Sequence, residues 1–382
     1  MTDYDAVAWV LYPGDSSSRD LVREEITIDP IRPNEVLAAP LYGCWEGNMG
    51  HAIARRPLDV CLVRDEEKVV IGNAGVVRVL ETGAAVTNVR AGQNAVVFPN
   101  GVADSRGYML KALGYDAPGQ VGLLSTRMKL TDRQVIPIPD NTRHTLPQWA
   151  AFSVRYVTAW SNWLVAWGVF RLQVFEDECP SPHTWGWGGG TTLAEMDLAR
   201  RHGCNTVMVS GKEQNLKAIA RLGITPLDRR PFADLAYDDQ RYQTDRDYRS
   251  RYKRAEVAFL GEVKRRTSNE MVQIFLDYVG DPVYRVTLKA LARHGVLATA
   301  GWKQGMNVSH LRSQECISRH QHIYTHYARY SQGVDAVQYG ETTGWMPEPD
   351  ERIYGFDEIP ELARDYACDR TGYFPCYAVN AS

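Results

Sequence analysis

Hydrophobic residues follow two different patterns along this chain, and the change between them falls near residue 150. Before that point, short runs rich in β-branched residues are interrupted by glycine or proline, as in 69–80, 95–99 and 134–140. Runs of this kind are typical of short, bent strands. Residues 1–150 are therefore expected to form a small β-barrel.

After residue 150 the chain alternates between segments typical of helices and of buried strands. Residues 148–168 form an apolar, Trp-rich stretch without proline that is long enough for a buried helix. A charged stretch at 232–254 is expected to be an exposed loop or an irregular helix. The alternation predicts a doubly wound parallel sheet with helices on both faces. Its expected helices are 193–202, 215–222 and 282–293, and its expected strands are 206–210, 271–277 and 295–301.

Composition and charge exclude several classes of function. The 382 residues include 43 Lys and Arg against 46 Asp and Glu, so the chain lacks the basic footprint of a protein that grips nucleic acid. No apolar run approaches the about 18–20 residues that span a bilayer, and the acidic start of the chain does not resemble a secretory signal. The seven cysteines are scattered without a C-x-x-C pair, which favours a reducing cytoplasm over a disulfide framework or clustered zinc site.

The strongest local signal is the glycine-rich segment 185–194, Trp-Gly-Trp-Gly-Gly-Gly-Thr-Thr-Leu-Ala. Glycines let a backbone turn sharply and approach a pyrophosphate, whose charge the following helix N-terminus favours. The alternative is an ordinary flexible loop, since the spacing departs from G-x-G-x-x-G. The stretch before it, 175–184, is polar and contains proline, so the first strand of the sheet is expected to be short.

The end of the expected strand 206–210 indicates which dinucleotide would bind. An NAD enzyme places Asp or Glu there to accept from the ribose 2′-hydroxyl. This chain has Ser210, Gly211 and Lys212 instead, and a hydroxyl, open space and a cation suit a 2′-phosphate. The cofactor is therefore expected to be NADPH. The alternative for Lys212 is a solvated lysine at the start of a helix.

The order of several motifs resembles one known superfamily over nearly the whole chain. Residues 91–97 are similar to a G-D-x-V-V motif with Gln93 in place of Asp, and 158–160 match a T-A-x that opens the helix of a cofactor domain. With 72–79, 277–282 and 295–301, they resemble the medium-chain dehydrogenase/reductase superfamily. This resemblance implies an α/β fold. A GroES-like catalytic domain would comprise 1–150 with 341–382, and a Rossmann NADPH-binding domain 151–340.

The resemblance also implies partners and contacts. The substrate would be a small molecule or an acyl thioester, without nucleic acid or membrane, and the protein would be a homodimer or homotetramer. The cofactor contacts would fall on Thr158, Gly186, Gly188, Gly189, Gly190, Thr191, Ser210, Lys212, Gly301 and Trp302.

Zinc enzymes of the superfamily carry a Cys ligand, a downstream Gly-His-Glu motif and often a four-Cys lobe. Here the second motif is replaced by Gly72-Asn73-Ala74, and no four-Cys cluster occurs. Cys44 and Glu46 stand roughly where the first ligand would be, and His51 follows nearby, but the downstream ligands are missing. No metal is therefore expected.

Among the zinc-free branches, residues 324–330 resemble a segment of the crotonyl-CoA carboxylase/reductase group, with His326 at the position of its histidine. Arg329 replaces that group's Asn, so carboxylation is not supported, and the alternative is a histidine packed among tyrosines.

The leading hypothesis is an NADPH-dependent, zinc-independent reductase of an activated C=C bond. Its polar catalytic candidates are Tyr42, Glu46 and Asn48, beside His326, and the alternative for the first three is a role in a turn. The alternative functions are reduction of quinones or carbonyls, and cofactor binding without turnover.

Overall fold

The structure, a computed structural model, describes residues 3–14, 21–300, 318–325 and 327–381. The chain folds into two compact units, Met1–Val157 with Ala328–Ser382, and Thr158–Tyr327. These bounds differ from the predicted ones. Helix α3 (Leu146–Arg171) runs through the first boundary without a break. The second predicted boundary lies inside α9 (Tyr330–Thr343), whose Tyr330 ring packs edge-on against Phe98 of the barrel, with 5.7 Å between the centroids.

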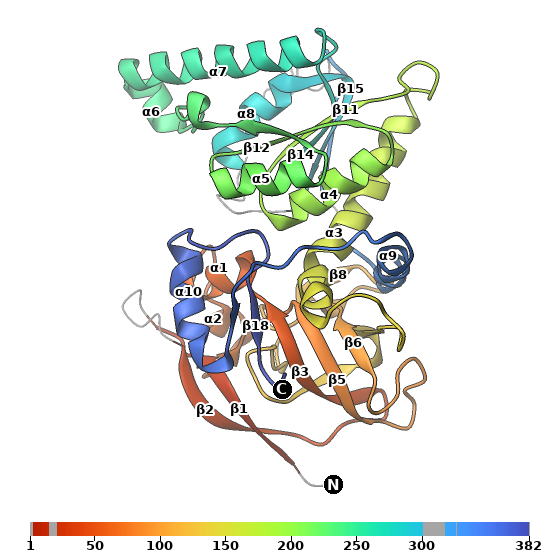
Figure 1. The fold of residues 1–382 in the computed structure, drawn as a ribbon. Coiled ribbons are helices and arrows are strands. Elements are labelled where there is room, and N and C mark those ends of the chain that lie inside the picture. The colour runs from red at the N-terminus through yellow and green to blue at the C-terminus, as the bar shows by residue number, and fades with distance from the viewer. Residues whose placement is uncertain (1–2, 15–20, 301–317, 326, 382) are drawn as a thin grey trace. The chain divides into compact units, whose positions relative to one another are not determined.

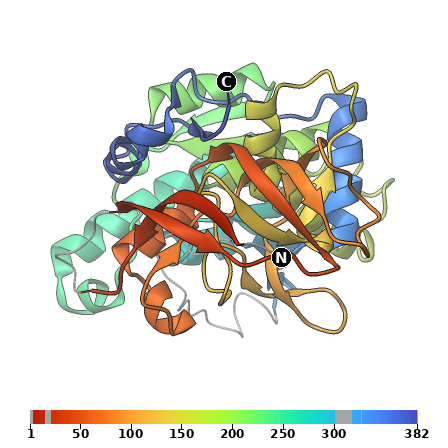
Figure 2. The same ribbon diagram turned by 90° about the horizontal axis from the view of Figure 1, so that it is seen from below.

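The first unit is built mainly from antiparallel strands, drawn from red to yellow in Figures 1 and 2, with strands from the end of the chain in blue. The larger sheet has the order β10-β6-β5-β3-β18-β17, with β9 also pairing with β3. A three-stranded sheet, β2-β1-β4, and the hairpin β7-β8 complete the unit. The strands are β1 (Tyr4–Leu11), β2 (Val22–Ile28), β3 (Glu35–Cys44), β4 (Val69–Val70), β5 (Gly75–Thr82), β6 (Asn94–Val97), β7 (Asn100–Ala103), β8 (Met109–Ala112), β9 (Met128–Thr131), β10 (Val135–Pro137), β17 (Ile353–Tyr354) and β18 (Cys376–Ala378).

The run 69–80 forms two strands separated by a turn, as its glycines predicted. β4 ends at Val70, Gly72 adopts a left-handed φ of 110°, and β5 begins at Gly75. Inward-facing side chains of β3, β5 and β6, such as Val36, Val77 and Val97, are fully buried in a common core. Helices α1 (Gly47–Ala54), α2 (Val60–Arg64) and α10 (Ile359–Ala367) also belong to this unit.

The second unit contains a six-stranded, wholly parallel sheet with the order β13-β12-β11-β14-β15-β16. This order places the first strand of the unit in the middle and reverses direction there, as in a doubly wound fold. Its strands are β11 (His183–Trp187), β12 (Asn205–Ser210), β13 (Thr225–Asp228), β14 (Val272–Asp277), β15 (Leu291–Thr299) and β16 (His322–Thr325). Its helices are α4 (Gly190–Arg201), α5 (Glu213–Arg221), α6 (Asp239–Thr244), α7 (Arg246–Arg266) and α8 (Asp281–Ala290).

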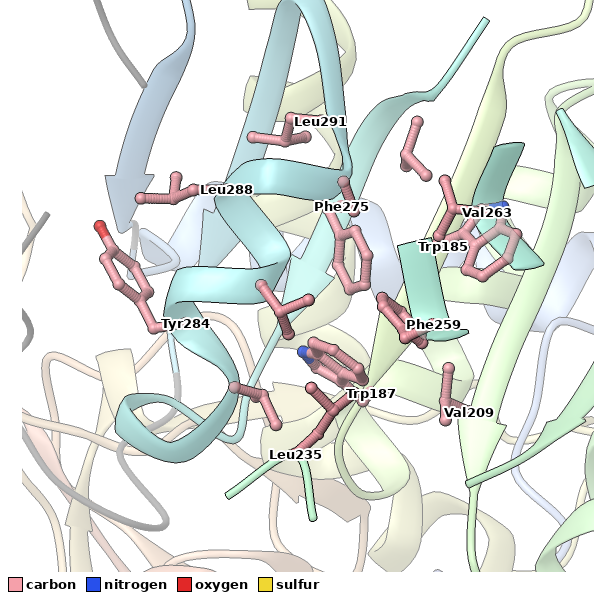
Figure 3. Close-up of a cluster of buried hydrophobic side chains, with 14 of the residues drawn as sticks. Trp185, Trp187, Val209, Leu235, Phe259, Val263, Phe275, Tyr284, Leu288 and Leu291 are labelled. Carbon is pink, nitrogen blue, oxygen red and sulfur yellow. The ribbon is translucent and has the colours of Figure 1, made fainter. Parts of the chain in front are cut away.

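Aromatic side chains fill the space between this sheet and α7 and α8 (Figure 3). The Trp187 ring of β11 stacks on Phe259 of α7 with 5.1 Å between the centroids, and Phe275 of β14 lies at the same distance. Burying aromatic area of this size anchors the centre of the sheet. The tryptophans at the start of the glycine-rich segment, Trp185 and Trp187, are therefore part of the hydrophobic core.

Two predicted elements differ from the structure. The first strand is short, as expected, but it takes only the last two residues of the polar stretch and continues through the Trp-Gly-Trp segment, since β11 spans His183–Trp187. The charged stretch 232–254 is mostly regular helix, because Asp245 caps α7 and accepts from the amide of Tyr248 at 2.9 Å. Tyr252, Ala255, Phe259 and Val263 then form a buried stripe at helical spacing. None of the helices in the described part of the chain is both long and apolar enough to cross a membrane.

Candidate functional site

The turn between β11 and α4 has the geometry of an open backbone cradle. Gly188 adopts a φ of 154°, and a Cβ there would lie 2.1 Å from Oγ1 of Thr192. Gly189 is exposed, caps the N-terminus of α4, and has no atom within 4 Å of its ideal Cβ position. The turn thus presents bare backbone at a helix N-terminus, where amide groups favour an anion.

The position of this turn in the sheet is also that of a ligand site. β11 pairs with β12 on one side and with β14 on the other, so the turn leaves the carboxyl end of the sheet where the strand order reverses. In open α/β sheets, ligands bind at this switch point. The amide of Tyr278, which follows β14, bonds to the carbonyl of Trp187 at 3.1 Å and draws the two strand ends together.

The predicted cofactor residues fall into distinct environments. Gly190 begins α4 and is buried, and Thr191 is half-buried beside it. Gly186 lies inside β11, where a Cβ would be 2.9 Å from Cγ2 of Thr192, so its missing side chain serves helix–strand packing. Thr158 is half-buried within α3, and its carbonyl accepts from Ser161. Gly301, Trp302 and His326 lie outside the described residues.

At the end of β12, Ser210 and Lys212 lie next to a second cation that the sequence analysis missed. Ser210 Oγ accepts from the Lys212 amide at 3.5 Å, and the Ser210 carbonyl accepts from the Arg229 amide at 3.0 Å. Nε of Arg229 is 3.0 Å from the ideal Cβ position of Gly211, so the exposed Arg229 side chain passes over that glycine. An Arg next to the strand end is a known way to hold a 2′-phosphate.

A buried polar cluster, formed by Asn162, Glu195, Tyr278 and Tyr324, lies beneath the turn. The Tyr278 hydroxyl donates to Glu195 Oε2 at 2.7 Å and accepts from Asn162 Nδ2 at the same distance. The Tyr324 hydroxyl donates to the Asn162 carbonyl at 2.7 Å. Glu195 and Asn162 are fully buried. Because the Cβ of Tyr278 is 2.9 Å from the ideal Cβ position of Gly188, the cluster supports the turn directly.

The environment of Glu195 favours its neutral form. Burial raises the pKa of Glu195 to about 8, although the Tyr278 hydroxyl and the Asn162 amide partly offset that rise. No signal in a single sequence marks this glutamate, because its partners come from three other segments. A neutral acid under the turn adds no negative charge where an anion would bind.

Three predicted catalytic residues of the first unit lie at the junction of β3 and α1. Glu46 caps α1 and accepts from the Asn48 amide at 2.7 Å, so these two residues are joined by a helix cap. Burial raises the pKa of the Glu46 carboxyl, while the Asn48 amide lowers it. Tyr42 is half-buried in β3, opposite Ala378 of β18.

A buried guanidinium, Arg155 of α3, joins this junction and was also missed. Its Nη1 lies 3.0 Å from Sγ of Cys44, and its Nη2 donates to the carbonyl of Trp45 at 2.6 Å. It is a charged residue within an apolar, Trp-rich stretch, which is the one feature of the sequence that sets it apart. Among the described residues, no three His, Cys, Asp or Glu side chains form a set that could hold a metal ion, and Cys44, Glu46 and His51 are all described.

Comparison with known proteins relates this fold to enzymes of known structure. No profile of a protein family matches the chain, and no curated protein matches its sequence. A crotonyl-CoA carboxylase/reductase, AntE, solved in complex with NADP, has a TM-score of 0.80 at 20% identity and covers 99% of this chain and 95% of its own. The 2-octenoyl-CoA carboxylase reductase CinF, solved with NADP and 2-octenoyl-CoA, has a TM-score of 0.80 at 17% identity, over 98% of this chain and 88% of its own.

A putative alcohol dehydrogenase from Sinorhizobium meliloti is also similar, with a TM-score of 0.74 at 18% identity over 99% of this chain and all of its own. These likenesses establish the fold. The chain has the same fold as these enzymes, with a GroES-like unit and a Rossmann unit.

Proposed function

We propose that this protein is an NADPH-dependent, zinc-independent reductase of an activated C=C bond, in an enoyl thioester or a similar compound. The observation that carries the proposal is the open Gly188–Gly190 turn at the switch point of the sheet. The NADP-bound carboxylase/reductases with the same fold support the choice of cofactor and reaction class.

The residues present fit the proposed cofactor. The bare amides of Gly189 and Gly190 would face its pyrophosphate at the start of α4, and Ser210, Lys212 and Arg229 would face its 2′-phosphate. No Asp or Glu ends β12 at Ser210, where a carboxylate would repel that phosphate. NADPH, when bound, supplies the hydride that reduces the double bond.

Tyr42 is the proposed proton donor of the first unit. Glu46 and Asn48 are already joined in the cap of α1, which favours a positioning role for both. Tyr42→Phe should lower kcat by about 100-fold or more and leave the Kd for NADPH unchanged, as expected on loss of a general acid. An unchanged kcat would remove Tyr42 from the proposal and leave the cofactor site intact.

Cofactor choice is tested by calorimetric titration with NADPH and with NADH. The protein should bind NADPH more tightly, and Ser210→Asp with Lys212→Glu should reverse or abolish that preference, because acidic groups repel the 2′-phosphate. Lys217→Glu is the matched control, since this exposed lysine lies further along α5. Equal effects of the two changes would contradict the assignment of the strand end.

The reaction class is tested by following NADPH absorbance with crotonyl-CoA and, separately, with a quinone. Oxidation with the enoyl thioester supports the proposal, and oxidation with the quinone alone supports the second candidate, a quinone or carbonyl oxidoreductase. The similar alcohol dehydrogenase is the observation that favours this second candidate. Tight NADPH binding without oxidation by any acceptor would identify a cofactor-binding protein without turnover.

A further inference from the structure

Two cysteines that are far apart in the sequence lie opposite each other on neighbouring strands of the first unit. β18 pairs antiparallel with β3, and Cys376 is the direct partner of Cys44. The amide of Trp45 bonds to the carbonyl of Pro375 at 2.8 Å, and the amide of Val379 bonds to the carbonyl of Leu41 at 2.9 Å. Because hydrogen-bonded and non-hydrogen-bonded pairs alternate along such a ladder, Cys44 and Cys376 form a non-hydrogen-bonded pair.

This kind of pair has the spacing that a disulfide needs. Opposed residues of a non-hydrogen-bonded pair have Cα atoms about 4.5 Å apart, within the about 4.4–6.8 Å of disulfides. Both cysteines are free thiols, and neither is exposed to solvent. The backbone spacing typical of such a pair is therefore compatible with a disulfide between the two sulfur atoms.

Arg155 provides the charge that activates one of the two sulfurs. Arg155 is 6% exposed, and its guanidinium lies 3.0 Å from Sγ of Cys44 and over the Phe374 ring, 5.7 Å from the centroid. The Glu46 carboxyl also interacts with the charge of Arg155, but burial raises the pKa of that carboxyl, whereas Cys44 lies in direct contact with the guanidinium. Since a buried arginine stays protonated, a thiolate on Cys44 is the anion that its surroundings favour.

The acidities of the two thiols follow from this arrangement. Burial alone would raise the pKa of Cys44, but the hydrogen bond from Cys376 and the charge of Arg155 outweigh it, so the pKa is lowered. The hydrogen bond to Cys44, together with burial, raises the pKa of Cys376 well above its ordinary value. Cys44 is thus the attacking sulfur, and Cys376 keeps its proton.

We infer that Cys44 and Cys376 form a redox modification site, in which a hydroperoxide converts the reduced pair into a cross-strand disulfide. The Cys44 thiolate attacks a peroxide oxygen, the O–O bond breaks, hydroxide leaves, and Cys44 becomes a sulfenic acid. The Cys376 sulfur then attacks Cys44, the S–O bond breaks, and water leaves as the S–S bond forms. Two thiols are oxidised and one hydrogen peroxide is reduced to two waters.

The disulfide would fasten the last strand of the chain to β3 beside Tyr42 and Glu46. It also removes the sulfur charge that faces Arg155. This site is separate from the proposed reductase function. The disulfide can be detected without cofactor or substrate, so its test does not depend on that function.

The test is oxidation of the full-length protein with hydrogen peroxide, followed by alkylation, digestion and mass spectrometry. Cys368→Ser serves as the background, because Cys368 is exposed and would otherwise crosslink between molecules. We expect a peptide that joins Cys44 to Cys376. Cys61 and Cys204 should stay reduced, because burial raises the pKa of each to about 11.

Cys376→Ser should stop the reaction at a sulfenic acid on Cys44 that dimedone traps, whereas the control Cys204→Ser should form the crosslink normally. Oxidation should raise the Tm of the background protein and of the Cys204→Ser variant, but not of Cys376→Ser.

Arg155→Gln should slow the oxidation of Cys44 by about tenfold or more. If that variant does not fold, the two cysteine variants still decide the result. Oxidation of Cys44 to a sulfinic acid with Cys376 left free, or no reaction at either, would overturn the inference.

Discussion

Glu195 is a carboxylic acid held neutral inside the second unit, and this has a consequence for stability. Its folded-state pKa of about 8 lies above the ordinary value of 4.5. The folded protein therefore binds a proton that the unfolded chain releases, and stability falls as the pH rises from about 4.5 to 8. The groups that face Glu195 are Asn162, Tyr278 and Tyr324, and none of them is a cation.

Glu195→Gln should remove this pH dependence and keep a hydrogen-bonding side chain. The difference in unfolding free energy between wild type and variant should change by about 1.4 kcal/mol per pH unit at most and level off above pH 8. Urea unfolding at pH 5, 6, 7 and 8 measures it. Glu46 and Asp277, whose pKa values burial also raises, are common to both proteins and cancel. Parallel stability curves would show that Glu195 is already ionised in the folded state.

Arg229 and Arg230 are neighbours in the chain with different surroundings, which makes them a matched pair. Arg230 is engaged by Asp228, at 2.6 Å, and Arg229 lies over Gly211. Arg229→Ala should weaken NADPH binding by about tenfold to 100-fold, since a charge-assisted hydrogen bond to phosphate is worth about 1.5–3 kcal/mol, and leave NADH binding unchanged. Arg230→Ala should change neither, as judged by calorimetry. An equal loss for both cofactors would place Arg229 away from the 2′-phosphate.

The sequence predicts Ser210 and Lys212 as phosphate-binding residues because Ser210 ends a buried strand and Lys212 follows it closely, and this assignment stays a prediction. Arg229, Arg155 and Glu195 could not, because each acquires its role from segments distant in the chain. Arg155 meets Cys44, and Glu195 meets Tyr278. A periodic pattern shows which face of an element is buried, but it does not show which polar group of another segment that face contacts.

At the scale of elements, the predicted helices and strands of the second unit were largely confirmed where hydrophobic residues recur with a clear period. Two elements lack a clear hydrophobic period and were not predicted correctly. β11 is built from Trp185 and Trp187 around a glycine, and it lacks the Val and Ile run of a typical buried strand. The start of α7 is so rich in charged residues that its buried tyrosines, Tyr248 and Tyr252, do not stand out in the sequence as part of an apolar stripe.

The turn after β11 offers a comparison between two adjacent glycines. Gly188→Ala should destabilise the protein by about 1–3 kcal/mol, because its φ of 154° is strained for alanine and the added Cβ meets Oγ1 of Thr192. Gly189→Ala should leave the Tm unchanged, since its φ is −101° and the space around it is open. It should nevertheless weaken NADPH binding, because the methyl group keeps a pyrophosphate from the backbone. Thermal melts with and without NADPH separate the two effects, and unaltered NADPH binding in Gly189→Ala would argue against the cradle.

At the scale of the whole molecule, the chain end completes the sheet of the first unit. β18 lies between β3 and β17, so residues near the C-terminus share a sheet with residues from the first part of the chain. The return of the C-terminal residues to the first unit was expected from the resemblance to a known superfamily. Composition and periodicity alone do not show it, because a three-residue strand leaves too short a pattern.

Gly43 tests how tightly this returning strand is packed. A Cβ at Gly43 would lie 2.1 Å from Cζ of Tyr377, whose ring is fully buried in the first unit. Gly43→Ala should therefore lower the unfolding free energy by about 1–3 kcal/mol, as overpacking does. Gly47→Ala is the control, because that position has no atom within 4 Å and begins a helix, where alanine is favoured. Combining Gly43→Ala with Tyr377→Leu, which removes the ring atoms that clash, should cost less than the sum of the two single changes. Strict additivity in calorimetric melts would mean that β18 does not pack on Gly43.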